Sequence, residues 1–258
     1  MPVEIIKGVE IGNVPRTPAQ PYFNSPLLDV AKTTLFTNAL RLGHPISFAQ
    51  EQSGALIQNI LPVHKNEHDQ ISTSSKVTLA LHTETSFHPY KPDYVMLLCL
   101  RGDPTAVTTY ANIDDIIEHL DNETISYLQD PVYLTGIDKS FRESNKEYTQ
   151  VKLPILKKVG RNEYNFNYDE DLMYPTNILA SMAIDKLAEA VCKCVKEIVL
   201  EAGDLLIIDN NKTIHGRKPF QPRYDGTDRW VQRMLIRKEL PPKDQINGHM
   251  LITNFEVL

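Results

Sequence analysis

The chain contains the stretch Gly203-Asp-Leu-Leu-Ile-Ile-Asp-Asn-Asn-Lys-Thr-Ile-His215-Gly-Arg217. Gly203 and Asp204 are typical of a turn, and the apolar run at 205–209 has the length and composition of a buried strand. His215 and Arg217 follow that strand within a few residues. The stretch therefore indicates a β-rich fold in which a buried strand is followed by potentially functional side chains, a histidine and an arginine.

Short strands also dominate the sequence on both sides of this stretch. The patterns predict strands at 4–11, 55–63, 76–82, 94–100, 106–111 and 230–237, and a β-hairpin at 148–168 that turns at Gly160-Arg161-Asn162. Many short strands with few long helices favour a sandwich or barrel, mainly β with flanking helices. The simplest organisation is a single domain over 1–258 that opens with a short strand-helix section at 1–45.

Four helices are predicted. The first has Ser25 as N-cap and ends before Gly43, with four residues in its buried stripe: Leu28, Leu35, Ala39 and Leu42. Two short helices are predicted at 112–120 and 123–129. The longest is predicted to be capped by Thr176, and its apolar residues are interpreted as core: Leu179, Met182, Ala183, Leu187, Ala190, Val191, Cys194, Val195 and Ile198. Cys192 and Cys194 lie on this helix with their thiols on different faces, so a zinc or redox pair is not favoured.

The composition argues against several classes of function. With 258 residues, a net charge of −6 and a pI of about 5.8, general binding to nucleic acid or to an anionic membrane is not expected. Three cysteines without framework spacing are typical of a reducing cytoplasm. The start Met-Pro-Val-Glu-Ile-Ile lacks the features of a signal peptide, and the apolar runs are too short to span a membrane. We expect a cytoplasmic protein whose partner is a small molecule, and the oligomeric state stays open.

A metal-binding pattern joins two distant parts of the chain. In His82-Thr83-Glu84 both flanking side chains project to one side of an extended segment, because the strand period is two. His215 can supply a third ligand from another strand, and two histidines with one carboxylate form the facial triad of non-heme Fe(II) oxygenases. A lone His-x-Glu is usually a surface accident. Here the apolar strands around both motifs, and the position of Arg229 fourteen residues after His215, favour the metal site.

Longer stretches around these motifs resemble a known family. The stretch His82-Thr-Glu-Thr-Ser-Phe-His-Pro-Tyr-Lys-Pro-Asp-Tyr-Val-Met-Leu-Leu-Cys-Leu-Arg101 resembles the first metal motif of clavaminate-synthase-like dioxygenases. The second motif is matched by Gly203 through Phe220 and by Tyr224-Asp-Gly-Thr-Asp-Arg-Trp-Val-Gln-Arg233. The resemblance spans roughly residues 50 to 237, with taurine dioxygenase as a more distant relative. It implies a double-stranded β-helix, or jelly roll, with helices on its outside.

The resemblance also implies roles for particular residues. His82, Glu84 and His215 match the iron ligands, and Arg229 matches the arginine that pairs with the distal carboxylate of 2-oxoglutarate. Thr108 matches a threonine that helps to hold this cosubstrate, with its neighbour Thr109 as the alternative. Arg233 matches an arginine near the substrate carboxylate, with a structural salt bridge as the alternative. The residues with a role implied by the resemblance are therefore His82, Glu84, His215, Arg229, Thr108 and Arg233.

The implied reaction uses Fe(II), 2-oxoglutarate and O2 to hydroxylate an unactivated C–H bond, with release of succinate and CO2. The iron supplies the chemistry and the protein aims the target carbon. Because a carboxylate stands at Glu84, halogenation is not expected. Desaturation and ring closure stay open as alternatives.

The substrate is indicated by an acidic segment. Asn167-Tyr-Asp-Glu-Asp-Leu-Met173 resembles a segment of arginine and lysine hydroxylases in which acidic side chains meet the cationic end of the substrate, here Asp169 and Asp171. A solvated acidic turn is the alternative. Gln50 and Gln52 lie in a region that resembles the contact to the substrate α-amino group. Only 81 residues precede the first motif, fewer than in amino-acid hydroxylases of this group, which leaves room for a peptidyl or carrier-bound substrate.

Two functions outside this class are less consistent with the sequence. A non-catalytic jelly-roll binding or sensor protein would not need the intact ligand set together with Arg229. A zinc-dependent hydrolase would leave Arg229 without a task and would lack an evident general base. The sequence therefore predicts a non-heme iron dioxygenase that hydroxylates an amino acid, basic rather than neutral, with arginine favoured over lysine.

Overall fold

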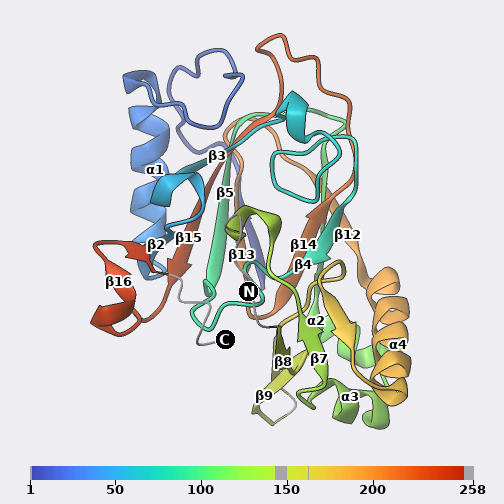
Figure 1. Cartoon of the computed structure of the whole chain (residues 1–258). Helices are drawn as coiled ribbons and strands as arrows, with labels where there is room; N and C mark the ends of the chain where they lie inside the picture. Colours follow the sequence, from blue (N-terminus) through green and yellow to red (C-terminus); the bar gives the residue numbers. More distant parts are fainter. Residues whose placement is uncertain (1, 143–149, 162, 253–258) are drawn as a thin grey trace.

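The computed structural model describes residues 2–142, 150–161 and 163–252. No helix within these ranges has the length and apolar character that crossing a membrane requires. Most regular structure in the described chain is β, and Figure 1 shows two sheets side by side between outer helices. The expected class, mainly β with flanking helices, is therefore confirmed.

The larger sheet has eight strands. Its strand order is β1-β13-β5-β15-β2-β17-β16, and β3 pairs with another part of β15. All pairs are antiparallel except β17 with β2. The bounds are β1 Val3–Ile6, β13 Leu205–Asp209, β5 Tyr94–Arg101, β15 Trp230–Arg237, β2 His44–Phe48, β17 Met250–Leu251, β16 Ile246–Asn247 and β3 Gln58–Ile60.

A smaller antiparallel sheet carries the motif histidines. Its order is β12-β6-β14-β4, with β12 Lys196–Val199, β6 Val107–Asn112, β14 Thr213–Arg217 and β4 Leu79–His82. Two minor sheets lie beside it: β11 Met173–Pro175, β7 Tyr133–Thr135 and β8 Val151–Leu153 form one, and β9 Leu156–Gly160 and β10 Glu163–Phe166 form the other.

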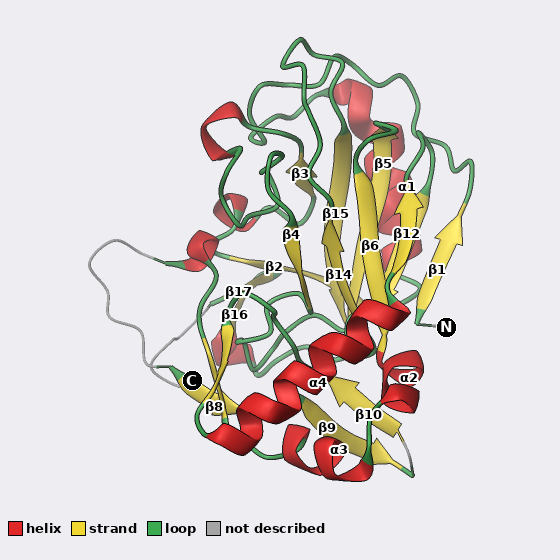
Figure 2. Cartoon of the chain, turned by 90° about the vertical axis from the view of Figure 1, so that its right-hand side faces the viewer, coloured by secondary structure: helices red, strands yellow, loops and turns green. Residues whose placement is uncertain are grey.

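Helices cover the outer faces of the two main sheets (Figure 2). The helix α1 Asp29–Ala39 packs on the larger sheet, and α4 Ile178–Cys194 packs on the smaller one. The short helical segments are η1 Pro26–Leu28, η2 Gln52–Gly54, η3 His64–Asn66, α2 Ile113–Ile116, η4 Ile117–His119, α3 Asn122–Leu128, η5 Lys139–Phe141 and η6 Lys243–Gln245.

The side chains of β5 point alternately to the two faces of the larger sheet, which explains why α1 packs on one face and the interior core on the other. Met96, Leu98 and Leu100 pack with Leu28, Ala31, Leu35 and Ala39 of the first helical segment. The residues between them face the interior and pack with other buried side chains: Val95, Leu97 and Cys99. Successive side chains on a strand point to opposite faces, so a strand that is apolar throughout can bury both faces.

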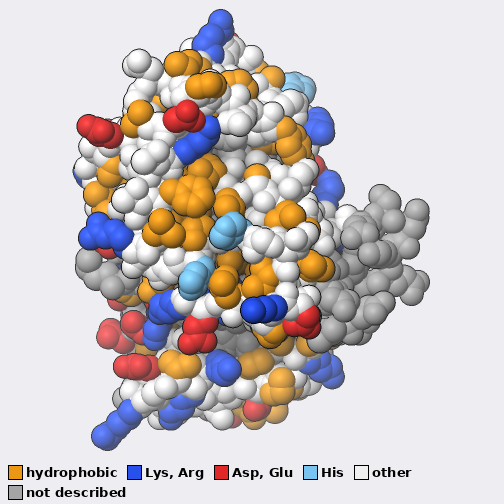
Figure 3. Space-filling model, turned by 90° about the vertical axis from the view of Figure 1, so that its left-hand side faces the viewer, with side chains coloured by type: hydrophobic (Ala, Val, Ile, Leu, Met, Phe, Trp, Pro, Cys, Tyr) orange, Lys and Arg blue, Asp and Glu red, His pale blue; other side chains and the backbone are white. Residues whose placement is uncertain are grey.

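The outer side of α1 faces the viewer in Figure 3, which shows hydrophobic side chains scattered among charged ones. Of the predicted stripe, Leu28, Leu35 and Ala39 are fully buried, and Leu42 packs against the same cluster while only partly buried. Ser25 is the N-cap of η1, as predicted, and its Oγ accepts from the backbone N–H of Leu27 at 3.3 Å. The position and the buried face of the first predicted helix are therefore confirmed.

The strands predicted at 205–209 and 230–237 coincide with β13 and β15. The predictions at 4–11, 55–63 and 76–82 are too long, because only Val3–Ile6, Gln58–Ile60 and Leu79–His82 pair in sheets. The hairpin turning at 160–162 is confirmed as β9 and β10, whereas β8 joins a different sheet. Residues 148, 149 and 162 of that prediction lie outside the described residues.

Three details of the long helix were predicted wrongly. The helix was predicted to include Val195 and Ile198, but α4 ends at Cys194, Val195 is its C-cap and Ile198 lies on β12. Asn177, not Thr176, is the N-cap of α4, and its Oδ1 accepts from the backbone N–H of Ala180 at 2.8 Å. The Thr176 hydroxyl instead donates to the carbonyl of Val132 at 2.8 Å, which ties the preceding turn to the minor sheet. Leu179 and Met182, predicted as core, are 44% and 55% exposed because their side chains lie outside the buried face of α4, whereas Ala180 and Ala183 of the same turns are buried in the core.

Asn177→Ala is expected to lower the free energy of unfolding by about 1 kcal/mol, since it leaves the N–H of Ala180 without its capping acceptor. Urea unfolding measures this loss. Asn177→Asp is the matched control, because aspartate keeps an oxygen acceptor at the cap and should stay close to the parent protein. An equal loss in both variants would contradict the capping assignment.

Candidate active site

Pairing between two strands brings the motif histidines together. In the register of β4 and β14, His82 lies opposite His215, and the two imidazole centroids are 4.6 Å apart. Glu84 follows β4 by two residues, and one ligand atom from each of the three side chains lies within 4.8 Å of the others. A Cβ on Gly216 would come within 2.5 Å of the carbonyl oxygen of Leu79, so only glycine allows this close strand approach.

The donor atoms fit a divalent iron ion. The Nδ1–H of His82 donates to the carbonyl of Ala80 at 2.8 Å, which leaves Nε2 as the ligand atom. The Nε2 of His215 lies 3.7 Å from Oε2 of Glu84, and its buried Nδ1 has no hydrogen-bond partner among the described residues. Two imidazoles and a carboxylate on adjacent strand ends are the ligand types of a 2-His-1-carboxylate site.

The electrostatic surroundings favour the protonation states that a metal needs. Burial opposes ionisation of Glu84, but the Arg233 guanidinium and the two imidazoles outweigh burial and hold the pKa of Glu84 well below its usual range. Burial also lowers the pKa of His215, although the Glu84 carboxylate opposes that shift. An ionised carboxylate beside a neutral imidazole is ready to bind a cation without first losing a proton.

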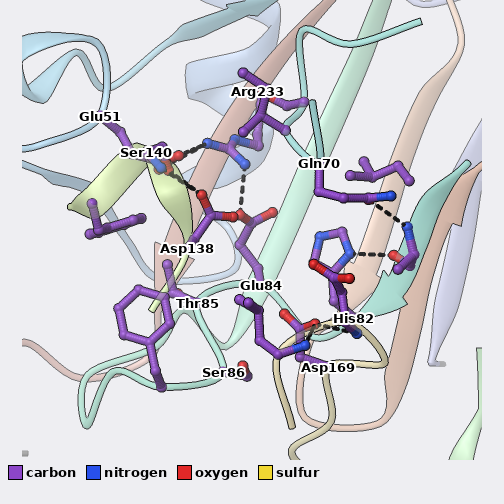
Figure 4. A pocket seen from close by; sticks show the side chains of 18 residues that line it. Glu51, Gln70, His82, Glu84, Thr85, Ser86, Asp138, Ser140, Asp169 and Arg233 are labelled. Carbon is purple, nitrogen blue, oxygen red and sulfur yellow. Dashed lines mark hydrogen bonds and ion pairs between the residues drawn. The ribbon is translucent and has the colours of Figure 1, made fainter. Parts of the chain in front are cut away.

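Arg233 lies beside the triad rather than apart from it (Figure 4). Its Nη1 donates to Oε1 of Glu84 at 2.6 Å, and its Nη2 donates to both carboxylate oxygens of Glu51 at 2.8 and 2.9 Å. Its Nε donates to the side-chain oxygen of Gln58 at 2.9 Å. The structure thus shows the salt bridge weighed in the sequence analysis, and contact of Arg233 with a substrate carboxylate stays a prediction.

Glu51 was missed by the sequence analysis, which named its neighbours on either side. Gln52 is held by the backbone of Asn59, with its Nε2 donating to the carbonyl at 3.1 Å and its Oε1 accepting from the N–H at 3.2 Å. Of the described residues near this turn, Glu51 lines the cavity beside the triad, and Gln50 and Gln52 do not. A charged residue three positions after the buried strand β2 was the signal that could have identified it.

One cavity, of about 450 Å³, lies between the triad and the strands β6, β14 and β15, and we call it the cosubstrate cavity. Arg229 lines it, is 7% exposed, and makes no hydrogen bond or ion pair with any residue that the structure describes. Burial lowers the pKa of Arg229. Thr108 lines the same cavity, whereas Thr109, next along β6, does not. Strand alternation therefore favours Thr108 over its neighbour.

A second guanidinium in this cavity was also missed. Arg217 donates to the carbonyl of Ser74 at 2.8 Å and to the hydroxyl of Ser74 at 3.1 Å, and no carboxylate in the described chain pairs with it. Burial, followed by the nearby Arg229 cation, lowers the pKa of Arg217 to about 9. These two buried cations pair with no carboxylate among the described residues, and their charge makes the cavity suited to an anion.

A second cavity beside the triad has an empty space of about 680 Å³, and we call it the substrate cavity (Figure 4). Five carboxylates line it: Glu51, Glu84, Asp138, Asp169 and Asp171. Asp169 is held in place by the backbone N–H groups of Asp171 and Leu172, which donate to its Oδ1 at 3.0 Å each. Burial raises the pKa of Asp169.

Asp138, at the start of η5, is a cavity residue that the sequence analysis did not predict. Its Oδ1 accepts from the backbone N–H of Ser140 at 2.7 Å and from the Ser140 hydroxyl at 2.8 Å. The segment brings this carboxylate opposite Asp169, from a part of the chain that carries no recognisable motif (Figure 4). Asp169 and Asp171 line the substrate cavity, and their contact with the cationic end of a substrate stays a prediction.

A cluster of two histidines and one carboxylate, with open space beside it, is typical of a mononuclear iron oxygenase. The chain belongs to the taurine catabolism dioxygenase TauD, TfdA family, whose model matches residues 23–235. The expected family membership is therefore confirmed.

Curated relatives include amino-acid oxygenases. The chain is 33% identical to an L-lysine 3-hydroxylase of Catenulispora acidiphila over 247 residues, covering 90% of this chain and 66% of the relative. It is 36% identical to an L-asparagine oxygenase of Streptomyces coelicolor, covering 80% of this chain and 61% of the relative. The chain thus spans less than two thirds of the length of these relatives.

Solved structures of similar proteins cover nearly all of the chain. Asparagine oxygenase in complex with Fe(II), 2S,3S-3-hydroxyasparagine and succinate matches with a TM-score of 0.88 and 32% identity, over 98% of this chain and 80% of that one. The non-heme iron oxygenase OrfP in complex with Fe and alpha-ketoglutaric acid matches with a TM-score of 0.87 and 30% identity, over 97% and 80%.

Proposed function

We propose that this protein is an Fe(II)- and 2-oxoglutarate-dependent oxygenase that hydroxylates an unactivated C–H bond of a basic amino acid or its derivative, with release of succinate and CO2. The observation that carries the proposal is that His82, Glu84 and His215 lie beside two cavities. One contains the guanidinium groups of Arg217 and Arg229, which pair with no carboxylate among the described residues, and the other is lined by carboxylates. The two mainly antiparallel sheets support a double-stranded β-helix in one domain, and a cytoplasmic location is part of the same proposal.

The three side chains would hold iron through Nε2 of His82, a carboxylate oxygen of Glu84 and Nε2 of His215. Iron bound there would activate O2 together with 2-oxoglutarate and so supply the oxidising power for attack on a C–H bond. The protein contributes the orientation of the imidazoles, through the Ala80 carbonyl, and the ionised state of Glu84 beside Arg233.

In the cosubstrate cavity, Arg229 would pair with the distal carboxylate of 2-oxoglutarate. A planar guanidinium can donate two parallel N–H bonds to a carboxylate, and such charge-assisted bonds are the strong ones. The Thr108 hydroxyl faces the same space and can donate a further hydrogen bond. Arg217 adds a second positive charge without competing anions in the described chain.

In the substrate cavity, the carboxylates of Asp138, Asp169 and Asp171 are suited to a guanidinium or an ammonium group. Two of them are held rigid by backbone N–H groups, so they need not reorganise when a cation arrives. This supports a basic side chain on the substrate. Among the relatives in this family, one is named a lysine hydroxylase and another an asparagine oxygenase, and these two substrates differ in side-chain charge. The charge of the substrate side chain is therefore the property to test.

Arg229→Lys is expected to raise the KM for 2-oxoglutarate by roughly ten- to a hundredfold, because a charge-assisted hydrogen bond is worth about 1.5–3 kcal/mol and lysine cannot make the bidentate pair. The kcat at saturating 2-oxoglutarate should fall much less. Steady-state succinate formation measures both constants. Lys218→Arg, at an exposed position beside the cavity wall, is a matched control that should leave the KM unchanged.

The proposed function is tested by incubating the Fe(II)-loaded protein with 2-oxoglutarate, O2 and each of the twenty amino acids and the amides of arginine and lysine. We expect succinate, together with a product heavier by one oxygen atom, for arginine, lysine or their amides and for few others. Product without added 2-oxoglutarate, or turnover restricted to acidic substrates, would contradict the proposal.

A further inference from the structure

The strand β4, which ends at His82, is the outermost strand of the smaller sheet, and a distant segment of the chain covers its outer edge. His82 and Asp169 form an isolated antiparallel bridge there. On one side of the bridge, the backbone N–H of Thr83 donates to the carbonyl of Tyr168 at 2.8 Å. Residues that face each other in such a bridge exchange no main-chain hydrogen bond, and their side chains lie close together. The side chain of Asp169 therefore lies beside that of His82, as Figure 4 shows.

Glu170 closes the other side of the bridge. Its backbone N–H donates to the carbonyl of Leu81 at 3.1 Å, and its Oε2 accepts from the N–H of Leu81 at 3.2 Å. Two backbone N–H groups further along, one of them that of Asp171, donate to Oδ1 of Asp169. Residues 168–172 thus form one compact unit, which we call the acidic turn. A contact that fixes its first residue also fixes the two carboxylates at the cavity wall.

The hydroxyl of Thr83 holds that first residue. Its Oγ1 donates to the carbonyl of Tyr168 at 3.3 Å and accepts from the N–H of Tyr168 at 3.3 Å, since a hydroxyl can donate and accept at once. Thr83 is 1% exposed and is not among the residues that line the two cavities, so a substrate does not reach it. Any effect of this hydroxyl on a substrate therefore passes through the acidic turn.

For a basic substrate, the position of the acidic turn would decide which carbon lies nearest the iron ligands. Neighbouring carbons of an alkyl chain are about 1.5 Å apart, and a misplacement of about 1 Å can cost roughly a hundredfold in rate. A substrate held at its cationic end by Asp169 and Asp171 presents a carbon that depends on the distance from these carboxylates to the triad. The bridge between His82 and Asp169 sets that distance.

We infer that Thr83 is a positioning residue, which holds the acidic turn at a fixed distance from the iron ligands and so selects the carbon that is hydroxylated. This inference rests on the proposed function and adds a residue to it. One buried hydroxyl bonds both main-chain groups of Tyr168, directly before Asp169. Without that hydroxyl, the N–H of Tyr168 has no acceptor among the described residues, and an unpaired buried donor favours movement of the turn.

Thr83→Val tests this role, because valine keeps the branched shape and removes the hydroxyl. The Fe(II)-loaded protein is given 2-oxoglutarate, O2 and the basic amino acid that the parent protein converts best, and succinate and each hydroxylated product are quantified. We expect succinate per hydroxylated product to rise about twofold or more, with a second position of hydroxylation. The KM for the amino acid should rise about two- to tenfold, which corresponds to the loss of one hydrogen bond. The KM for 2-oxoglutarate should not change, since Arg229 and Thr108 lie on other strands.

Two further variants separate positioning from a general loss of structure. Thr83→Ser keeps the hydroxyl and should restore the parent pattern of products. Thr176→Val is the matched control, because it removes a hydroxyl that donates to the main-chain carbonyl of Val132 at 2.8 Å, at a residue that lines neither cavity. A merely structural role for Thr83 would lower kcat and stability but leave succinate per product and the hydroxylated position unchanged.

A surface residue tests the same bridge from its other side. Glu170→Leu removes the side-chain acceptor of the Leu81 N–H, whereas Glu170→Gln keeps an oxygen there and removes only the charge. We expect the altered pattern of products in Glu170→Leu and the parent pattern in Glu170→Gln. Because Glu170 is exposed, both variants should fold even if Thr83→Val does not.

Hydrogen exchange makes the test independent of turnover. In the metal-free protein, the backbone amides of residues 168–172 should exchange about two- to tenfold faster in Thr83→Val than in the parent and in Thr83→Ser. Amides of α1, which packs on the other sheet, should exchange alike in all three proteins.

Two results overturn the inference: the same succinate per product and the same hydroxylated carbon in the parent and Thr83→Val proteins, or unchanged exchange in the acidic turn. Either result leaves the oxygenase function standing, since succinate is still formed. If the parent protein forms no succinate with any basic amino acid, the proposed function fails. The exchange comparison then still decides whether Thr83 holds the acidic turn in place.

Discussion

His82→Ala and His215→Ala are each expected to abolish hydroxylation, with a loss of more than about a hundredfold in kcat/KM. Each change removes one of two imidazoles that lie in register on paired strands, and even outer partners of metal ligands cost ten- to a hundredfold when they are removed. The fold should persist, because the core clusters of both sheets contain neither side chain. Succinate formation and iron content per protein measure the two effects.

His44→Ala is the matched control for these variants. His44 is exposed at the start of β2 and lies in neither cavity within the described residues, so its variant should keep full activity and bound iron. Full turnover by the double variant His82→Ala/His215→Ala would refute the assignment of the iron site.

Arg233→Met is expected to destabilise the protein by about 3–5 kcal/mol, since it leaves the buried carboxylates of Glu51 and Glu84 without their shared partner. The midpoint of urea unfolding measures the loss in the metal-free protein. In the double variant Arg233→Met/Glu51→Gln, part of the stability should return, because one of the two unpaired charges is gone. A double variant that is less stable than Arg233→Met alone would contradict this account.

The same variant should show a characteristic dependence on pH. Burial raises the pKa of Glu51 even with Arg233 beside it, and removal of the guanidinium raises that pKa further. A carboxyl group with a raised pKa binds more protons in the folded state than in the unfolded state, so its contribution to stability falls as pH rises above the unfolded value. The deficit of Arg233→Met should therefore be larger at pH 8 than at pH 5.

The sequence predicted much of the local structure because local structure depends on neighbouring residues. The apolar run of β13, the alternation in β15 and the hairpin turn at Gly160 each carry a periodic or turn signal within a few residues. The cap of α4 was misplaced by one position, because Thr176 and Asn177 are both good capping residues and only the hydrogen bond to Ala180 distinguishes them.

The three candidate iron ligands could also be named from the sequence. Their residue types and the spacing of His82 and Glu84 follow from what a metal requires of an extended segment. The choice between Thr108 and Thr109 could not be made in this way, because it depends on which face of β6 turns toward the cosubstrate cavity. The pairing of β6 with β14 decides that.

Spacing, periodicity and residue type were sufficient to predict a mainly β chain with a candidate metal-ligand set, since short stretches of sequence carry these signals. The role predicted for Arg229 came from the resemblance to a known family. The partners of Arg233 were decided only when distant segments packed together. Glu51 and Glu84 are 182 and 149 residues away along the chain, and Asp138 reaches the cavity from a segment without any motif. Charge pairing between such residues depends on burial and on distance in space, and neither is encoded in local sequence.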